Sequence, residues 1–363
     1  MRALWLVRRN LTHHPGGDTT QILQTAAALR SIGLDVVTTD AAAPDFAGFD
    51  VVHLFHLDRL WENEFHARRI RRSRVPAVLS PIYWPADEFD RAARAGVQGF
   101  LARVLGSGPY QSARLAQRQA LHCIQTASLR TLSFRSLRFR AAARFLLDSV
   151  RVILPNSFAE KSIISRRFGV ERSAVIVPNA ADAGLFSPDP AAPRAARSVL
   201  CVGRIEPRKN QLALIRALRE MDVSLTLVGG AGRFSASYLQ RCRREANASV
   251  RFSGPLSHDQ LAAHYRRAAV HACVSWYETP GLSSLEAGLC GCRLVVTPGG
   301  CTREYFGEDA EYAEPGDVES IRAAIARALA APQRSALAQR IAREFTWEAA
   351  ARQTLEAYQL ALR

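Results

Sequence analysis

Short apolar runs alternate with helix-like stretches along almost the whole chain, and this alternation restricts the possible folds more than any other feature. In the first half, the apolar runs predict strands at residues 4–7, 36–38, 51–55, 77–79, 152–154 and 175–177, with helices between them at 19–31, 113–126 and 158–168. Parallel strands need such crossover helices, because each helix returns the chain to the start of the next strand. The pattern therefore predicts an α/β fold with helices on both faces of a parallel sheet.

The alternation stops once and then begins again. Residues 178–197 contain four prolines and little periodicity, which is typical of a linker between domains. A second series of strands is predicted at 199–202, 225–228, 250–252, 270–274 and 294–296, and a last amphipathic helix at 347–362. A chain of 363 residues is long enough for two cores. We therefore predict two doubly wound, Rossmann-like domains that face each other across a cleft: residues 1–178, completed by the C-terminal helix 346–363, and residues 179–345.

Composition indicates a globular protein of a reducing compartment. Hydrophobic residues make up 48% of the chain, yet no run of about twenty apolar residues could span a bilayer. Residues 1–11 are more typical of a first buried strand than of a signal peptide. The seven cysteines lack the spacing of a disulfide framework, and Cys290-Gly-Cys292 is one residue too tight for the usual zinc pair. We expect a cytoplasmic protein, with the inner face of the membrane as a further possible location.

The net charge of +15 calls for an anionic partner, and nucleic acid, an anionic membrane surface and phosphorylated ligands are the usual ones. The charge is uneven, because residues 91–147 contain ten arginines and no Asp or Glu, interspersed with apolar pairs such as Phe100-Leu101 and Val104-Leu105. A helical surface that makes a peripheral contact with anionic lipid fits this composition. An arginine-rich helix face exposed to solvent fits it equally well.

The usual nucleotide and metal motifs are missing. The sequence has no G-x-x-x-x-G-K-[ST], no complete G-x-G-x-x-G after a strand, and no Asp-x-Asp pair to hold a metal against a diphosphate. Side-chain cations and backbone amides would have to neutralise any diphosphate that this chain binds. We therefore expect neither a metal nor a cofactor.

A cationic turn follows the first strand of the second domain. There the sequence GRIEPRKN, at 203–210, joins the strand to a helix. A glycine turn with three cations, at the carboxyl end of a strand and the start of a helix, predicts a seat for a pyrophosphate. The alternative is that Arg208 and Lys209 are solvated turn residues.

A second motif, SWYETPGLSSLEA at 275–287, follows the predicted strand 270–274. Gly281 would let the backbone approach a ligand, and the amides of residues 282–284 would be unsatisfied donors at the start of a new helix. Glu286, a turn inside that helix, could accept hydrogen bonds from both ribose hydroxyls, while Glu278 could meet a sugar. The alternative is that Ser283 and Glu286 form a capping box, which needs no ligand.

Together, VGRIEPRKN and the E-x7-E pattern in ETPGLSSLEAG resemble the retaining glycosyltransferases of the GT-B fold, the large family that includes sucrose synthases and many bacterial cell-surface enzymes. The similarity extends over most of the chain. ILPNSFAEKSI and VIVPNAADAGLFSP resemble the family's crossing between domains, VRFSGPLSHDQLAAHYRRAAV resembles its nucleobase-side segment, and FTWEAAARQTLEAY resembles the helix that returns to the first domain.

The resemblance implies roles for individual residues. Arg204 and Lys209 would bind the donor diphosphate, and Glu278 would contact the transferred sugar near its reacting face. Glu286 would hold the ribose. The remaining donor-side positions, whose backbone would lie beside phosphate or sugar oxygens, are Gly281, Leu282 and Ser283 in the second domain and Gly16 and Gly17 in the first.

One departure from the family concerns the first domain. Members often carry a His just after a strand, near the anomeric carbon, where this chain has SPIYWP at 80–85. Tyr83 and Trp84 could stack on a sugar or belong to the core. His53 and His56 end the strand 51–55 and could replace the missing His; His53 could instead be a satisfied buried histidine, and His56 is the stronger candidate. Asp18 begins a capping-box pattern, which favours a structural role.

The resemblance implies transfer of a sugar from a UDP- or GDP-linked donor to a hydroxyl of a glycan or lipid-linked acceptor, with retained configuration and without a metal, in bacterial cell-surface polysaccharide or glycolipid synthesis. A non-hydrolysing sugar-nucleotide epimerase or a phosphorylase would share this architecture and is the nearer alternative. A basic nucleic-acid-binding protein would explain the charge, but no recognition motif is present, so we expect no nucleic acid.

Overall fold

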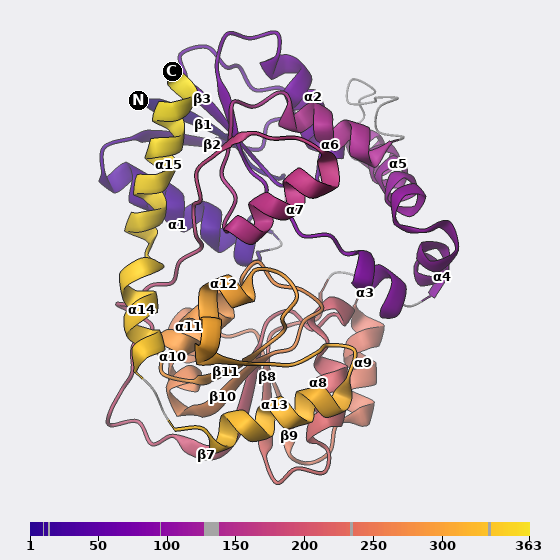
Figure 1. Ribbon diagram of the computed structural model, residues 1–363, viewed down its shortest axis with the longest axis vertical. Helices are drawn as coiled ribbons and strands as arrows, with labels where there is room; N and C mark the ends of the chain where they lie inside the picture. Colours follow the sequence, from indigo (N-terminus) through magenta and orange to yellow (C-terminus); the bar gives the residue numbers. More distant parts are fainter. Residues whose placement is uncertain (10, 14, 95, 127–137, 233–234, 333–334) are drawn as a thin grey trace. The chain divides into compact units, whose positions relative to one another are not determined.

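The computed structural model describes residues 1–9, 11–13, 15–94, 96–126, 138–232, 235–332 and 335–363. The chain folds into two compact units, each built on its own sheet (Figure 1). Unit 1 comprises Met1–Asp87, Ala95–Pro178 and Trp347–Arg363, and unit 2 comprises Glu88–Arg94 and Asn179–Thr346. The C-terminal helix therefore belongs to unit 1, and a short segment from the first half of the chain belongs to unit 2.

Unit 1 contains a six-stranded parallel sheet in the order β2-β1-β3-β4-β5-β6. Its strands are β1 Arg2–Leu6, β2 Asp35–Thr39, β3 Val51–Phe55, β4 Ala77–Ser80, β5 Val152–Ile153 and β6 Ser173–Ala174. Its helices are α1 Gly17–Ser31, α2 Leu60–Ile70, α4 Gly96–Leu105, α5 Ser107–Thr126, α6 Phe139–Leu147, α7 Phe158–Phe168 and α15 Trp347–Leu362, while α3 Asp87–Ala92 lies mostly in unit 2.

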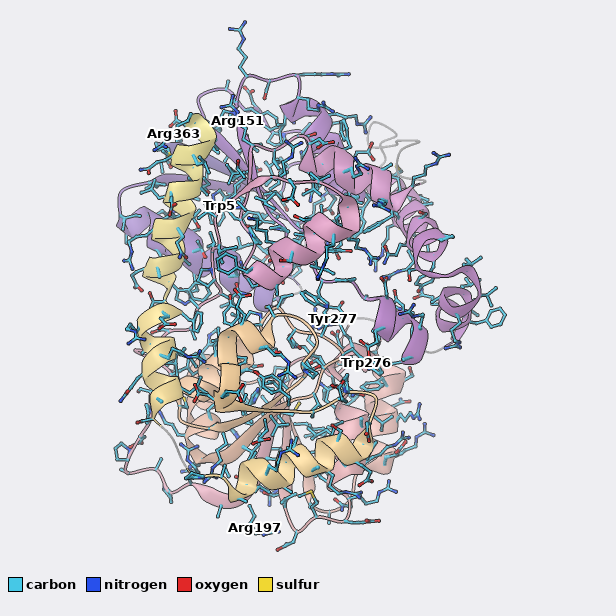
Figure 2. The ribbon with its side chains drawn as sticks, viewed as in Figure 1. Trp5, Arg151, Arg197, Trp276, Tyr277 and Arg363 are labelled. Carbon is cyan, nitrogen blue, oxygen red and sulfur yellow. The ribbon has the colours of Figure 1, made fainter. Side chains whose placement is uncertain are left out.

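The two faces of this sheet bury alternate residues of the same strand. On β1, Ala3 and Trp5 pack with α1 and α15, whereas Leu4 and Leu6 pack with α2, α6 and α7. Figure 2 shows the Trp5 ring beside α15, where its Nε1 donates a hydrogen bond of 2.7 Å to the Tyr358 hydroxyl. Because both faces are covered, every position of such a strand favours an apolar residue, which explains the continuous apolar runs in the sequence.

Unit 2 contains a second six-stranded parallel sheet, in the order β12-β11-β10-β7-β8-β9. Its strands are β7 Ala195–Val202, β8 Ser224–Val228, β9 Val250–Gly254, β10 Ala268–Cys273, β11 Arg293–Val296 and β12 Ala310–Tyr312. Its helical elements are η3 Pro207–Lys209, α8 Gln211–Leu218, α9 Ala236–Glu245, α10 His258–Arg267, α11 Leu282–Leu289, α12 Thr302–Phe306, η4 Gly307–Asp309, α13 Val318–Ala330 and α14 Ala336–Glu344.

The predicted fold class is confirmed: both sheets are parallel and carry helices on both faces. Two strands differ from the prediction. The strand expected at 175–177 is β6 Ser173–Ala174, although the amides of Val175 and Val177 still donate to the neighbouring chain at Ile153 and Pro155. Strand β12 was not predicted, because its three residues, AEY, are all only partly buried and form no apolar run.

Each sheet has one point at which the strand order reverses. In unit 1 the chain moves from β1 to β2 on one side and then to β3 on the other. In unit 2 it moves from β7 outward to β8 and β9, and returns to β10 on the opposite side of β7. Doubly wound sheets bind ligands beyond the carboxyl ends of the two strands that meet at such a point. The loops after β1 and β3, and those after β7 and β10, are therefore the places to look for functional residues.

Candidate functional site

The cationic turn after β7 is tied to the neighbouring loops of unit 2. Asn210 ends the turn with φ of 62°, a left-handed conformation that Asn tolerates better than most residues. Its Nδ2 donates to the main-chain oxygens of Val274 (3.2 Å) and Pro315 (2.8 Å). The oxygen of Arg208 accepts a hydrogen bond of 2.9 Å from the amide of Trp276. These bonds fix the turn against the loops that follow β10 and β12 (Trp276 is labelled in Figure 2).

Lys209 and Glu278 form a buried ion pair in this arrangement. Lys209 Nζ lies 2.5 Å from Glu278 Oε1, and Arg208 Nη1 lies 3.7 Å from the same oxygen. Burial would raise the pKa of Glu278, but the charges of Lys209 and Arg208 outweigh it and lower that pKa to about 2. Glu278 is therefore a carboxylate at all ordinary pH values. Lys209 is not a solvated turn residue, so that alternative is wrong.

The two arginines of the turn differ in exposure. Arg208 donates to the Tyr277 oxygen (3.1 Å), and its guanidinium lies 5.1 Å from the centre of the Tyr277 ring. Arg204 leaves half of its side chain exposed, and its Nε lies 3.6 Å from Glu206. Arg204 is thus the cation of this turn that solvent or a ligand reaches most readily.

Helix α11 begins beside the Glu278 carboxylate. Its N-cap is Gly281, which has φ of 95°, and a Cβ at this glycine would lie 3.4 Å from Glu278 Oε2. The Gly281 oxygen accepts from the amide of Ser284 at 3.0 Å. The amides of Leu282 and Ser283 donate to no residue in the described part of the chain. Such amides at a helix start are donors suited to an anion.

Glu286 lies inside α11 and is 9% exposed. Its Oε2 accepts a hydrogen bond of 3.0 Å from the hydroxyl of Tyr265, on α10. Burial raises the pKa of Glu286 to about 7, and the bond from Tyr265 offsets only part of that rise. The capping-box alternative is wrong, because the N-cap is Gly281 and Ser283 is already helical. Glu286 is therefore a carboxyl group whose charge changes near neutral pH.

The loop after β11 also belongs to this site, and the sequence analysis missed it. The amide of Glu278 donates to the Gly299 oxygen (3.0 Å), and the Glu278 oxygen accepts from Cys301 (3.1 Å). Gly300 has φ of 104°, and a Cβ there would lie 1.8 Å from the Glu278 oxygen, so only glycine fits. The Pro-Gly-Gly sequence directly after a predicted strand was the available signal.

In unit 1, the loop after β1 meets the end of β3. Gly16 is the N-cap of α1, and its amide donates to Thr19 Oγ1 at 3.1 Å. The predicted capping box at Asp18 is therefore wrong. Asp18 instead accepts from Arg8 Nε (2.6 Å) and lies 3.3 Å from His56 Nε2. Burial would raise the pKa of Asp18, but His56 and Arg8 hold it well below its usual range.

His56 is held in this position by an unusual turn. It has φ of 69°, which is uncommon for a residue other than glycine. Asn63 Nδ2 donates to the main-chain oxygens of both Phe55 (2.8 Å) and His56 (2.7 Å). The His56 side chain is therefore the histidine of this strand that lies at the reversal point of unit 1, next to the start of α1.

His53 and Tyr83 belong to the core of unit 1 instead. The ring nitrogens of His53 lie 2.8 Å from the Tyr358 hydroxyl and 2.9 Å from Ser80 Oγ, and burial lowers the pKa of His53 to about 3. Tyr83 is 3% exposed, and its ring packs against α7. The predictions that these two side chains contact a sugar are therefore wrong. Trp84 is partly buried.

A hollow of about 330 Å³, part of it open to solvent, lies at the same edge of the unit 1 sheet. It is lined by the chain after β1 and β2 and by helices α2 and α5. Burial lowers the pKa of His66 to about 4, whereas the pKa of Glu62 is lowered, against its burial, by Arg59 and the histidines. None of the lining residues was predicted, because only folding brings α2 and α5 together. The polar ones are Arg9, Asp40, Glu62, His66 and His122.

Two searches of the described residues found nothing. No three His, Cys, Asp or Glu side chains come together there in a way that could hold a metal ion. No described helix combines the length and the hydropathy that crossing a membrane would require.

Known proteins resemble this chain in sequence and in fold. Residues 186–345 match the family model described as glycosyl transferases group 1. The GDP-mannose-dependent alpha-(1-6)-phosphatidylinositol monomannoside mannosyltransferase of Mycolicibacterium smegmatis is 29% identical over 225 residues, which cover 54% of this chain and 58% of the relative; the match thus spans less than two thirds of that protein.

Two solved structures share the fold over nearly their whole length. Sucrose-phosphate synthase from Thermosynechococcus elongatus aligns over 99% of this chain and 98% of its own, with a TM-score of 0.75 and 20% identity. The Anabaena protein Alr3699/HepE, solved in complex with UDP and glucose, aligns over 98% of both chains with a TM-score of 0.69 and 16% identity. This chain therefore has the GT-B fold and belongs, through residues 186–345, to the glycosyl transferases group 1 family.

Proposed function

We propose that this protein is a retaining glycosyltransferase that moves a sugar from a UDP- or GDP-linked donor to an acceptor hydroxyl, in the synthesis of a bacterial cell-surface polysaccharide or glycolipid. The observation that carries the proposal is the convergence of the cationic turn at 203–210, the Glu278 carboxylate and the start of α11 at the reversal point of the unit 2 sheet. The group 1 family match and the mannosyltransferase relative support it.

The donor diphosphate is assigned to the cationic turn and the start of α11. Arg204 and Lys209 would pair with the phosphate oxygens, and the amides of Leu282 and Ser283 would donate to them. A helix start and side-chain cations together bind a phosphate without a metal. Lys209 already carries a carboxylate partner in Glu278, so the half-exposed Arg204 would supply the larger share of unbalanced positive charge.

The two glutamates of α11 and its preceding loop take different roles. Glu286, once ionised, can accept hydrogen bonds from both ribose hydroxyls of the nucleotide. Glu278 stays ionised because of Lys209, and it would accept hydrogen bonds from hydroxyls of the transferred sugar. Its negative charge would also favour a positively charged, oxocarbenium-like transition state.

The chemical step needs few protein groups. The bond between the anomeric carbon and the diphosphate breaks, and its electron pair stays on the leaving phosphate oxygen. The acceptor oxygen then forms its bond on the same face of the sugar, and its proton passes to that phosphate oxygen. Cations and amides aimed at the leaving group stabilise the charge that develops there, and losing one such donor commonly costs ~3 kcal/mol of barrier, about a hundredfold in rate.

The acceptor is assigned to unit 1. Its reversal point holds His56 and Asp18, and the adjacent hollow is lined by carboxylates, histidines and the Phe65 ring. Carboxylates that accept from hydroxyls and aromatic faces that pack on sugar rings suit a glycan or the head of a lipid-linked sugar. Trp84, near the end of β4, remains a further acceptor-side candidate.

The test is a titration of the whole protein with UDP, GDP and ADP, followed by turnover with the sugar donor of the base that binds. We expect one nucleoside diphosphate to raise the melting temperature, and NMR of the product to show the donor's anomeric configuration. An altered sugar formed from donor alone would indicate an epimerase, and turnover that requires inorganic phosphate would indicate a phosphorylase. Binding of short DNA duplexes that weakens steeply with salt, without nucleotide binding, would favour a nucleic-acid-binding protein.

A further inference from the structure

Helix α4 turns its large apolar side chains outward. The residues buried on this helix are the small Gly99 and Ala102. In an ordinary surface helix the large apolar stripe faces the core and polar residues face the water. On α4 the stripe has the spacing of one helix face, and its members are Val97 (74% exposed), Phe100 (59%), Leu101 (38%), Val104 (63%) and Leu105 (42%).

The neighbouring helix extends this character. α4 packs on α5, which in turn packs on α2 and α6, and α4 lies at the edge of unit 1 beyond α5 (Figure 1). On α5, Leu121 and Ile124 are 46% and 75% exposed. Single exposed apolar residues are common on soluble proteins, but a continuous stripe of five on one helix marks an interaction surface.

The charge of this region indicates what the surface binds. Arg103, Arg114 and Arg118 are the charged side chains of Lys, Arg, Asp or Glu type on α4 and α5, and no Asp or Glu occurs between residues 91 and 147. Residues 95 and 127–137 of that span lie outside the described part of the chain. A second copy of the protein would bring the same acid-free, arginine-bearing face against itself, which like-charge repulsion opposes. An anionic surface complements it.

We propose that α4 docks into the interface of an anionic lipid bilayer, with its apolar stripe at the boundary of the acyl chains and the arginines of α4 and α5 against lipid phosphates. A short helix with a wide apolar face and basic neighbours lies flat in that interface, and its binding depends on both the apolar area and the anionic lipid. The inference rests on α4 and α5 alone and does not require the proposed donor site.

The test is sedimentation of the whole protein with vesicles made of equal parts phosphatidylglycerol and phosphatidylcholine, or of phosphatidylcholine alone. The wild-type protein should sediment with the anionic vesicles, less so at high salt, and poorly with the neutral ones. F100E and V104E should each weaken binding about tenfold or more, because each removes one large apolar side chain from the interface. I32E is the matched control: Ile32 is 45% exposed at the end of α1, and its substitution should leave binding unchanged.

Three results would overturn the proposal: no binding of the wild-type protein to anionic vesicles, binding of the F100E/V104E double variant equal to that of I32E, or a wild-type dimer in gel filtration that the double variant converts to a monomer. The last result would assign the stripe to a second copy of the chain. F100S/V104S replaces the double variant if the glutamates impair folding. Nucleoside diphosphate titration of the same variants should match the wild type, and its loss in all proteins would count against the donor site instead.

Discussion

Lys209 Nζ lies 2.5 Å from Glu278 Oε1, although the two residues are 69 positions apart in the chain. Their side chains are 15% and 7% exposed. Removing one partner of a buried ion pair leaves the other charge without compensation, which typically costs about 3–5 kcal/mol. The pair therefore links the folding of unit 2 to the chemistry of its candidate site, and the two cations of the turn can be separated by that link.

We expect K209A and R204A to differ in stability but not in activity. K209A should lower the free energy of unfolding by about 2–4 kcal/mol, since Arg208 still partly compensates Glu278. R204A should stay within about 0.5 kcal/mol of the wild type, because Arg204 is half exposed. Both should reduce sugar transfer about a hundredfold. Urea unfolding and a transfer assay measure the two quantities, and near-normal turnover in both variants would refute the pyrophosphate seat.

Nucleotide binding should depend on the ionisation of Glu286. The pKa of Glu286 is raised to about 7, so its carboxylate, the form that accepts from both ribose hydroxyls, increases as pH rises from 6 to 8. We expect nucleoside diphosphate affinity to rise up to about tenfold over that range. E286Q should bind more weakly and lose this rise. Calorimetric titration at several pH values provides the measurement, and an unchanged pH profile in E286Q would exclude the role.

Glu286 should also affect stability with the opposite trend. Its folded-state pKa lies above the ordinary value of 4.5, so the folded protein binds more protons than the unfolded chain between pH 4.5 and 7. The contribution of Glu286 to stability is therefore present below pH 4.5 and is lost as pH rises through 7, by up to about 3 kcal/mol. Denaturation of the nucleotide-free wild type and E286Q at pH 5 and pH 8 should show the difference between the two proteins change in that direction.

Tyr265 should position Glu286 rather than contact the nucleotide. Its hydroxyl donates to Glu286 Oε2, which stabilises the carboxylate and lowers its pKa. Y265F should therefore move the midpoint of the pH dependence of binding above that of the wild type, with weaker binding at pH 7 and recovery at higher pH. A purely structural role would weaken binding equally at every pH, so the shape of the profile decides between them.

The sequence contained the elements of the site but not its wiring. The turn at 203–210 and the E-x7-E pattern could be recognised because each follows a buried strand whose apolar run is visible locally. Asn210, Tyr265 and Gly300 could not, because their roles depend on contacts with Pro315, Glu286 and Glu278 that local spacing does not encode. The same limit explains the two histidines of β3: both end an apolar run, and only the packing of α15 against β3 shows that His53 is enclosed.

Glycines after β8 provide a test of how the cationic turn is supported. Gly229 has φ of 137°, and a Cβ there would lie 2.1 Å from the oxygen of Gly203, which begins the turn. We expect G229A to destabilise unit 2 by more than about 2 kcal/mol and to weaken nucleotide binding by displacing the turn. G254A is the control: Gly254 also has a positive φ, but a Cβ there meets nothing among the described residues, so it should cost only about 1 kcal/mol. Equal losses in the two variants would mean that the contact with Gly203 is unimportant.

The two histidines at the end of β3 should separate stability from catalysis in unit 1. H53A removes hydrogen bonds to Tyr358 and Ser80 and leaves a cavity in the core, so we expect a loss of about 2–4 kcal/mol in stability with transfer per folded molecule little changed. His56 is held through its main chain by Asn63, and H56N keeps the tolerance for a positive φ, so stability should change by less than about 1 kcal/mol. Transfer by H56N should fall at least about tenfold while nucleoside diphosphate affinity stays at the wild-type value. Reduced transfer in H53A with normal transfer in H56N would reverse the assignment of the two residues.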